Sequence, residues 1–219
     1  TSYGLTALDA ITDGDNNTCI GYSAGSALTT GHRNVFVGQG AGTAITTGTH
    51  TIAIGNAAAS GYDTEINNMA IGHVALGGSV NGGEYNVAVG NYTLDALTSA
   101  DACVAIGYNA GTAITTGGSN TLVGFAAGAA MVDGDGNVCV GTNAGNDITS
   151  GANNVAIGQD ALAQTTTTDA NIAIGRNALQ LPDTETHNIA IGHLAMSGSV
   201  AGGEYNVAIG GLALDALTS

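Results

Sequence analysis

The chain has 219 residues and a formal net charge of −15, with only two basic side chains, Arg33 and Arg176. A chain with this excess of negative charge repels nucleic-acid phosphates and anionic lipid surfaces. We therefore expect no nucleic-acid partner and no membrane insertion. Glycine occupies 36 positions, tryptophan is absent and aromatic residues make up 4%, which excludes a conventional globular core of large side chains.

A repeat of 17 residues, with two steps of 18, runs along the whole chain and is marked by glycines that follow Val or Ile. β-Branched residues dominate the short run before each glycine, which predicts a strand there. A second short apolar stretch in each unit, as at residues 93–97 and 213–217, predicts another strand. Counting Gly4 as the first mark, the repeat continues in chain order through Gly21, Gly38, Gly55, Gly72, Gly90, Gly107, Gly124, Gly141, Gly158, Gly175, Gly192 and Gly210.

These elements predict an all-β parallel β-solenoid of about 13 coils, in which residues 1–219 form one solenoid and not separate domains. Stacking at the ~4.8 Å spacing of paired strands makes a rod of roughly 60 Å. Residues 72–99 match residues 192–219 at 20 of 28 positions, so the chain contains about two seven-coil blocks that are offset by 120 residues. Neither end shows a polar cap, so we expect this solenoid to be a segment of a longer array.

Asparagine recurs four residues before the glycine, where only Thr51 and Cys103 replace it. Side-chain amides stacked at this position can bond to one another or to backbone groups of the turns. We therefore expect a structural ladder and not a ligand site. The predicted ladder consists of Asn17, Asn34, Asn68, Asn86, Asn120, Asn137, Asn154, Asn171, Asn188 and Asn206.

From Gly21 onward, the residue two positions before each glycine is apolar in every coil. Alternate side chains of a strand point to opposite faces, so if the flanking Val and Ile residues fill the interior, this column points outward. An outward apolar column favours lateral packing of chains, most simply as a homotrimer, and the alternative is a half-exposed column that is small because of turn geometry. The predicted inter-chain residues are Phe36, Ala53, Ala70, Ala88, Ala105, Leu122, Ala156, Ala173, Ala190 and Ala208.

The unit Asn-Val-Ala-Ile-Gly-x-x-Ala, as at residues 154–161, resembles the head repeat of trimeric autotransporter adhesins and similar repeats in phage tail fibres. The resemblance covers nearly the whole chain, although the adhesin heads use shorter coils. It implies a left-handed parallel β-roll, three chains wound side by side, and a structural or adhesive shaft segment of an extracellular or virion fibre on a cell surface or particle. Besides the chain itself, a host-surface receptor or glycan is a candidate partner of the Glu84-Tyr85 and Glu204-Tyr205 pairs in the two 18-residue coils, and accommodation of the additional residue in the turn is the alternative.

Calcium is the one candidate cofactor. Two Asp-x-Asp-x-Asn runs resemble the opening of an oxygen-liganded calcium loop, although neither is followed by the bidentate glutamate of such loops. A plain turn rich in Asp and Gly is the alternative. The candidate ligands are Asp13, Asp15, Asp133 and Asp135.

Other chemistry has less support in the sequence. No histidine has a nucleophile and a carboxylate set around it, so we expect no enzymatic activity. Threonine pairs such as Thr29-Thr30 keep an ice-binding solenoid open as an alternative, beside a self-polymerising extracellular filament or sheath protein. Cys19, Cys103 and Cys139 lie in non-adjacent coils, at least ~9 Å apart and beyond the ~7 Å Cα limit of a disulfide, so we expect free, buried thiols.

Overall fold

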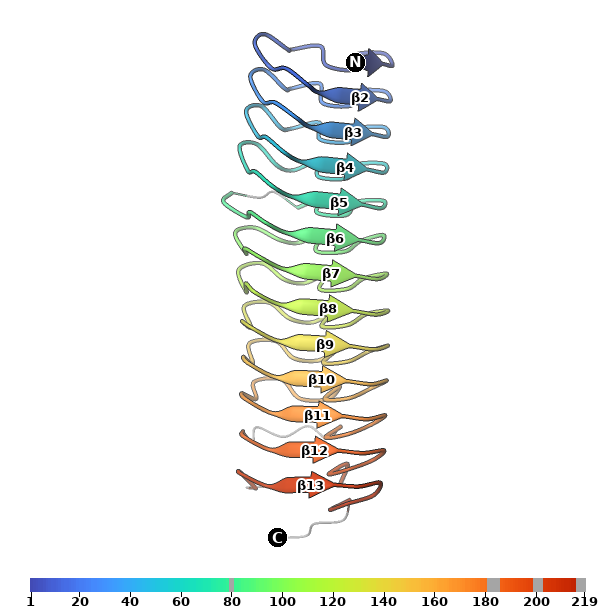
Figure 1. The fold of residues 1–219 in the computed structure, drawn as a ribbon, viewed down its shortest axis with the longest axis vertical. Helices are drawn as coiled ribbons and strands as arrows, with labels where there is room; N and C mark the ends of the chain where they lie inside the picture. Colours follow the sequence, from blue (N-terminus) through green and yellow to red (C-terminus); the bar gives the residue numbers. More distant parts are fainter. Residues whose placement is uncertain (79–80, 181–185, 199–202, 216–219) are drawn as a thin grey trace.

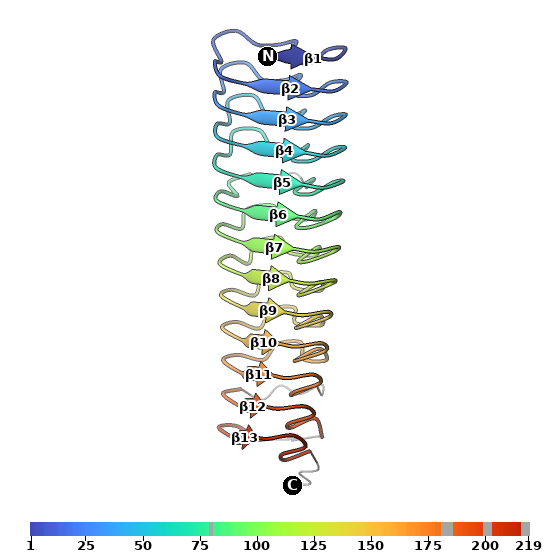
Figure 2. The same cartoon turned by 45° about the vertical axis from the view of Figure 1, so that its right-hand side comes forward.

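Thirteen parallel strands form one sheet in sequence order along one side of an elongated rod (Figure 1). The computed structural model describes residues 1–78, 81–180, 186–198 and 203–215. Each strand lies directly on the strand of the preceding coil, so the chain winds from β1 at one end of the rod to β13 at the other (Figures 1 and 2). The predicted all-β parallel β-solenoid with a period of about 17 residues is confirmed, with about twelve turns.

The strands are short. β1 has two residues and each of the others has three. The described residues contain no helix that is long and apolar enough to cross a membrane. The strands are β1 (Ser2–Tyr3), β2 (Thr18–Ile20), β3 (Val35–Val37), β4 (Ile52–Ile54), β5 (Met69–Ile71), β6 (Val87–Val89), β7 (Val104–Ile106), β8 (Thr121–Val123), β9 (Val138–Val140), β10 (Val155–Ile157), β11 (Ile172–Ile174), β12 (Ile189–Ile191) and β13 (Val207–Ile209).

The register of the sheet follows the repeat. Val155 pairs with Ile172, which lies 17 residues further on. In an 18-residue coil, Met69 pairs with Val87, so the additional residue is absorbed outside the strands and the register of the sheet is kept.

A glycine ends every strand because no other residue fits there. The φ angles of these glycines lie between 127° and 143°, a region that side chains rarely enter. The next coil also approaches closely: a Cβ on Gly141 would lie 2.6 Å from the carbonyl oxygen of Gly158. The regular spacing of glycine in the sequence is thus a direct consequence of coils stacked backbone on backbone.

The predicted second strand does not occur in the described part of any coil. After the glycine the chain makes turns in which left-handed residues recur at every second position, as at Ser23 (φ 54°) and Gly25 (φ 59°). The turns are nevertheless bonded along the rod. The Ser23 N–H donates to the Leu5 carbonyl of the preceding coil (3.0 Å), and the Gly25 N–H donates to the Ala41 carbonyl of the next (2.9 Å).

The two faces of the sheet are the reverse of the prediction. The middle residue of each strand from β2 to β13 points into the coil and is buried, whereas the flanking residues are partly exposed, as at Ile106 (41% exposed). The interior is narrow and is already occupied by large residues of the turns, such as Leu28 and Ile45. The column predicted to join chains therefore lies inside its own coil: Phe36, Ala53, Ala70, Ala88, Ala105, Leu122, Ala156, Ala173, Ala190 and Ala208.

Side-chain volumes in this interior compensate one another between strand and turn. The Phe36 ring occupies space that Gly25 and Gly42 leave open, since a Cβ on either glycine would lie 2.8 Å from a ring carbon. Where the turn carries a large residue instead, as at Leu162, the strand of that coil contributes only an alanine, Ala156. These two layers of the core are therefore filled from opposite sides.

Candidate interaction surface

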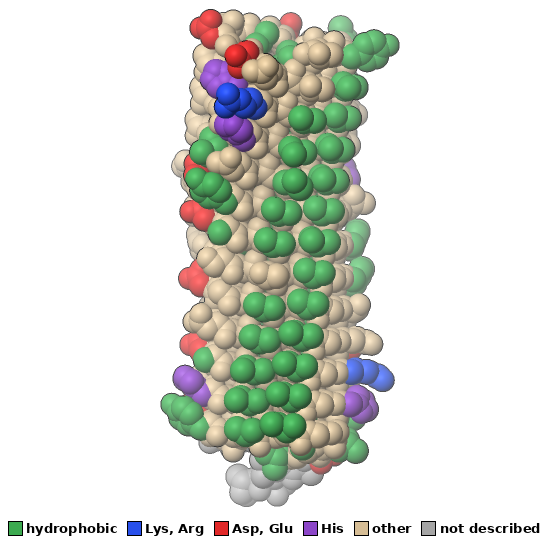
Figure 3. Space-filling model, in the orientation of Figure 1, with side chains coloured by type: hydrophobic (Ala, Val, Ile, Leu, Met, Phe, Trp, Pro, Cys, Tyr) green, Lys and Arg blue, Asp and Glu red, His purple; other side chains and the backbone are tan. Residues whose placement is uncertain are grey.

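Two columns of aliphatic side chains cover the outer face of the sheet from β2 to β13 (Figure 3). They are the first and third residues of the twelve three-residue strands, which gives 24 positions. Thr18 and Thr121 are polar and the other 22 positions carry Val, Ile or Met, so these strands present no charged side chain. We call this surface the aliphatic face. A continuous exposed apolar surface of this kind marks an interaction site.

The two margins of the aliphatic face differ in charge. The margin at the amino ends of the strands, six residues before each glycine, is acidic in half of the twelve coils: Asp15, Glu84, Asp101, Asp135, Asp169 and Glu204. Its one basic neighbour is Arg33, five residues before Gly38. The margin at the carboxyl ends, formed by the two residues after each glycine, has one acidic side chain, Asp160, and includes Arg176. We call them the acidic margin and the carboxyl-end margin.

An aromatic row lies along the carboxyl-end margin. The His73 and Tyr92 rings meet edge to face with their centroids 5.2 Å apart, and Tyr92 meets Tyr108 in the same way at 5.9 Å. Tyr108 stacks on Phe125 at 5.5 Å. Successive coils thus place one ring above another beside the aliphatic face. The repeat does not predict this row, because only two other coils, with Tyr22 and His193, carry a ring at these positions.

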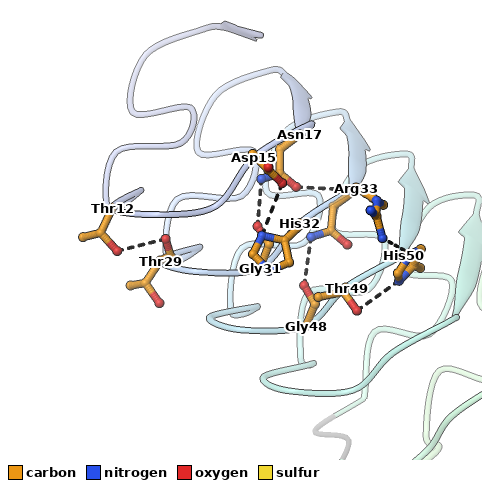
Figure 4. A network of polar contacts seen from close by, with 11 residues as sticks. Thr12, Asp15, Asn17, Thr29, Gly31, His32, Arg33, Gly48, Thr49 and His50 are labelled. Carbon is orange, nitrogen blue, oxygen red and sulfur yellow. Dashed lines mark hydrogen bonds and ion pairs between the residues drawn. The ribbon is translucent and has the colours of Figure 1, made fainter.

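The predicted asparagine ladder is confirmed, and it uses both ends of each amide. Asn17 Nδ2 donates to the Gly31 carbonyl of the next coil (2.8 Å), as Figure 4 shows. Asn17 Oδ1 accepts the N–H of Asn34 (3.0 Å), and Asn34 Nδ2 in turn donates to the Gly48 carbonyl (2.8 Å). Asn137 repeats this pattern, donating from Nδ2 to Gly151 (2.8 Å) and accepting at Oδ1 the N–H of Asn154 (3.0 Å). Since both amide atoms are engaged and buried, the ladder is structural.

The two residues that replace asparagine in the ladder differ in their hydrogen bonds. Cys103 Sγ donates to the Gly117 carbonyl at 3.5 Å, which is the acceptor that an asparagine amide would reach. Thr51 Oγ1 is buried and has no hydrogen-bond partner. The ladder therefore has a defect in the coil that contains β4.

The four candidate calcium ligands do not converge on one site. Asp135 Oδ1 accepts the Gly118 N–H at 2.6 Å, and Asp15 Oδ1 lies 3.4 Å from His32 Nδ1. Within the described ranges, no group of three or more His, Cys, Asp or Glu side chains is placed to hold a metal ion. Calcium binding stays a prediction for these exposed carboxylates: Asp13, Asp15, Asp133 and Asp135.

The three cysteines are free and buried, as predicted. Burial raises the pKa of the Cys19 thiol to about 11 and that of Cys139 to about 12. Burial also raises the pKa of the Cys103 thiol. All three are therefore neutral at physiological pH, and they act as small apolar residues of the interior rather than as nucleophiles.

The threonines of the turns bond to the backbone. Thr29 Oγ1 donates to the Thr46 carbonyl of the next coil at 3.0 Å, and Thr115 Oγ1 donates to the Val132 carbonyl at 3.2 Å. Asp63 and Val132 interrupt the threonine column. The threonine column is therefore interrupted, and these two hydroxyls bond to the backbone of the next coil.

Comparisons of the chain with protein-family models, with curated proteins and with solved structures gave no match. The structure itself shows a parallel β-solenoid repeat fold.

Proposed function

We propose that the chain is a structural shaft segment of an extracellular or virion fibre, displayed on a cell surface or particle and without enzymatic activity. The supporting observation is the uninterrupted stacking: all twelve strand pairs are parallel and join residues 17 or 18 positions apart. Each coil then adds one fixed step of ~4.8 Å to the length. A shaft requires length and stiffness, and this architecture supplies both.

Three features that run along the rod support a stiff shaft. The strands and turns are hydrogen-bonded from coil to coil, the asparagine amides bridge consecutive coils, and the interior is filled without a break by buried side chains. The resemblance of the repeat to trimeric autotransporter adhesin heads and phage tail fibres adds to this proposal. The chains of those families associate in threes, and the resemblance therefore supports self-association as part of the proposal.

An adhesive contribution is a second element of the proposal. Tyr85 and Tyr205 belong to the two 18-residue coils and are 57% and 72% exposed. Glu84 and Glu204 precede them directly. An exposed ring beside a carboxylate suits contact with a glycan or a protein receptor on a host surface. This contact is secondary to the shaft role, because it involves two coils and the stacking involves all of them.

Labelling of intact source cells or particles tests the shaft proposal. An antibody raised against the folded chain should label extended surface structures in electron micrographs without permeabilisation. The control is the same antibody absorbed with purified chain, which should remove the label. Labelling that appears only after permeabilisation would contradict the proposal, and thermal hysteresis of the purified chain would favour the ice-binding alternative instead.

A further inference from the structure

We infer that the aliphatic face is the docking surface for a second copy of this chain, with the two rods parallel, face to face, and related by a two-fold axis along the rod. The inference concerns solution assembly and does not depend on the shaft role. The size, the repeat and the charge of this face favour a second copy of the chain as the partner.

The size of the face matches what a small stable interface needs. Twelve strands at ~4.8 Å spacing span about 53 Å, and three residues at ~3.3 Å give a width of about 10 Å. Covering both faces of a pair would therefore bury about 1,100 Å² before the margins are counted, which is just above the ~1,000 Å² expected of a specific interface. The side chains are still accessible in the single chain, since Ile20, Ile54 and Ile157 are 42%, 38% and 38% exposed.

The repeat of the face favours another copy over an unrelated protein. Its side chains recur at one fixed step along twelve coils, so a partner must present apolar side chains at the same step to fill the gaps between them along the whole face. A second copy has this step by construction. Two such sheets pack about 10 Å apart, which is the spacing of sheets in β-sandwiches.

The charges of the margins favour parallel rods. Rotation about an axis along the rod keeps each coil at its height and places the acidic margin of one copy opposite the carboxyl-end margin of the other. Rotation about an axis along the strands would instead set acidic margin against acidic margin, bringing side chains such as Asp101 and Asp135 near those of the partner. Like charges juxtaposed at an interface are unfavourable, so the parallel pair is preferred.

The mass of the chain in solution tests the pairing. Sedimentation equilibrium at about 10 μM should give 42.4 kDa, twice the 21.2 kDa of the chain. A variant that combines Ile54→Glu and Ile106→Glu places two carboxylates on the aliphatic face and should raise the dimer dissociation constant at least about 100-fold. Both side chains are partly exposed in the single chain, so the coils are expected to fold.

Matched variants separate loss of pairing from loss of folding. Thr47→Glu with Thr116→Glu adds the same charge to exposed positions in the turns, and this variant should stay dimeric. Ile54→Thr with Ile106→Thr keeps the β-branched shape and should weaken pairing about 10-fold while leaving the circular dichroism spectrum unchanged. A monomeric parent chain, a trimer, or a dimer that both face variants leave intact would overturn the inference.

The direction of the rods has its own measurement. Energy transfer between donor and acceptor dyes on the N-terminal amines of two copies should be high in a parallel pair, because both amines lie at one end. In an antiparallel pair the amines would be about 58 Å apart, twelve steps of ~4.8 Å, and transfer would be low. Low transfer in a confirmed dimer would overturn the parallel arrangement.

Discussion

The asparagine column shows how one buried residue type joins the coils. From Asn17 to Asn154, each amide of the column bonds to a carbonyl of the next coil and accepts a backbone N–H from it, so the polar groups of the narrow interior are satisfied by the following repeat. The cost of losing such a residue is visible at Thr51, whose shorter side chain leaves its hydroxyl buried without a partner. A buried polar group in this state costs about 1–3 kcal/mol.

Thr51→Asn should therefore stabilise the chain. The amide would reach the backbone groups that its neighbours in the column already bond, and we expect the free energy of unfolding to rise by about 1 kcal/mol. Thermal or urea unfolding followed by circular dichroism measures it. Cys103→Asn is the matched comparison and should gain less, because Cys103 already donates to the Gly117 carbonyl. An equal or larger gain at Cys103 would count against the ladder as the cause.

The orientation of the strand residues could have been predicted from the asparagine column. Asn34 and Phe36 are two positions apart, and residues two apart share a face of a strand. An interior ladder therefore requires an interior Phe36 and an outward Val35 and Val37, which is what the structure shows. The prediction failed because it assumed that the Val and Ile columns fill the interior, although the space inside the coil is set by the large turn residues that face the strand.

A single coil is a three-residue strand followed by a long turn, and the sequence revealed the first far better than the second. The glycine that ends each strand is visible in the repeat because its φ angle admits no other residue. The left-handed turn positions carry many residue types, including Leu76, Tyr92 and Asn109, so they have no sequence signature. Bonds to adjacent coils hold these residues in place, and these bonds form only in the stack.

Two glycine variants separate the cost of a positive φ angle from the cost of close approach by the next coil. Gly141→Ala would combine a strained φ of 135° with a contact on the Gly158 carbonyl, and it should lower the free energy of unfolding by at least about 3 kcal/mol. Gly40→Ala is the control: its φ is 66° and a Cβ there meets nothing within 4 Å, so the cost should be about 1 kcal/mol. Similar urea midpoints for the two variants would contradict close backbone approach as the reason for the repeated glycine.

At the scale of the whole molecule, the rod is a sum of similar layers, and its length follows from their number. This was predictable from the repeat alone, since a 17-residue period with one β-rich run leaves little choice besides a solenoid. The two seven-coil blocks also imply that the solenoid can be shortened in phase. Gly72 and Gly192 directly follow β5 and β12 in equivalent coils, so joining residue 72 to residue 193 leaves the repeat intact.

Deleting residues 73–192 should give a folded rod that is shorter by seven coils, or about 34 Å. Small-angle scattering measures the maximum dimension, and circular dichroism should retain the β-sheet spectrum. Deleting residues 73–188 removes nearly the same length but shifts the repeat by four positions. This out-of-phase control should be less stable than the in-phase deletion, because the four additional residues at the junction either leave the stack or place strand residues on turn residues. Equal stability of the two deletions would show that register does not govern assembly.

The exchange of volume around Phe36 has a consequence for how such a chain can change over time. At the equivalent coil of the second block, 120 residues later, Ala156 replaces Phe36 and Leu162 replaces Gly42. The large side chain belongs to the strand in the first block and to the turn in the second, and the interior of the coil is filled in both. Phe36→Ala alone would empty that layer and Gly42→Leu alone would crowd it, so these two positions have to change together.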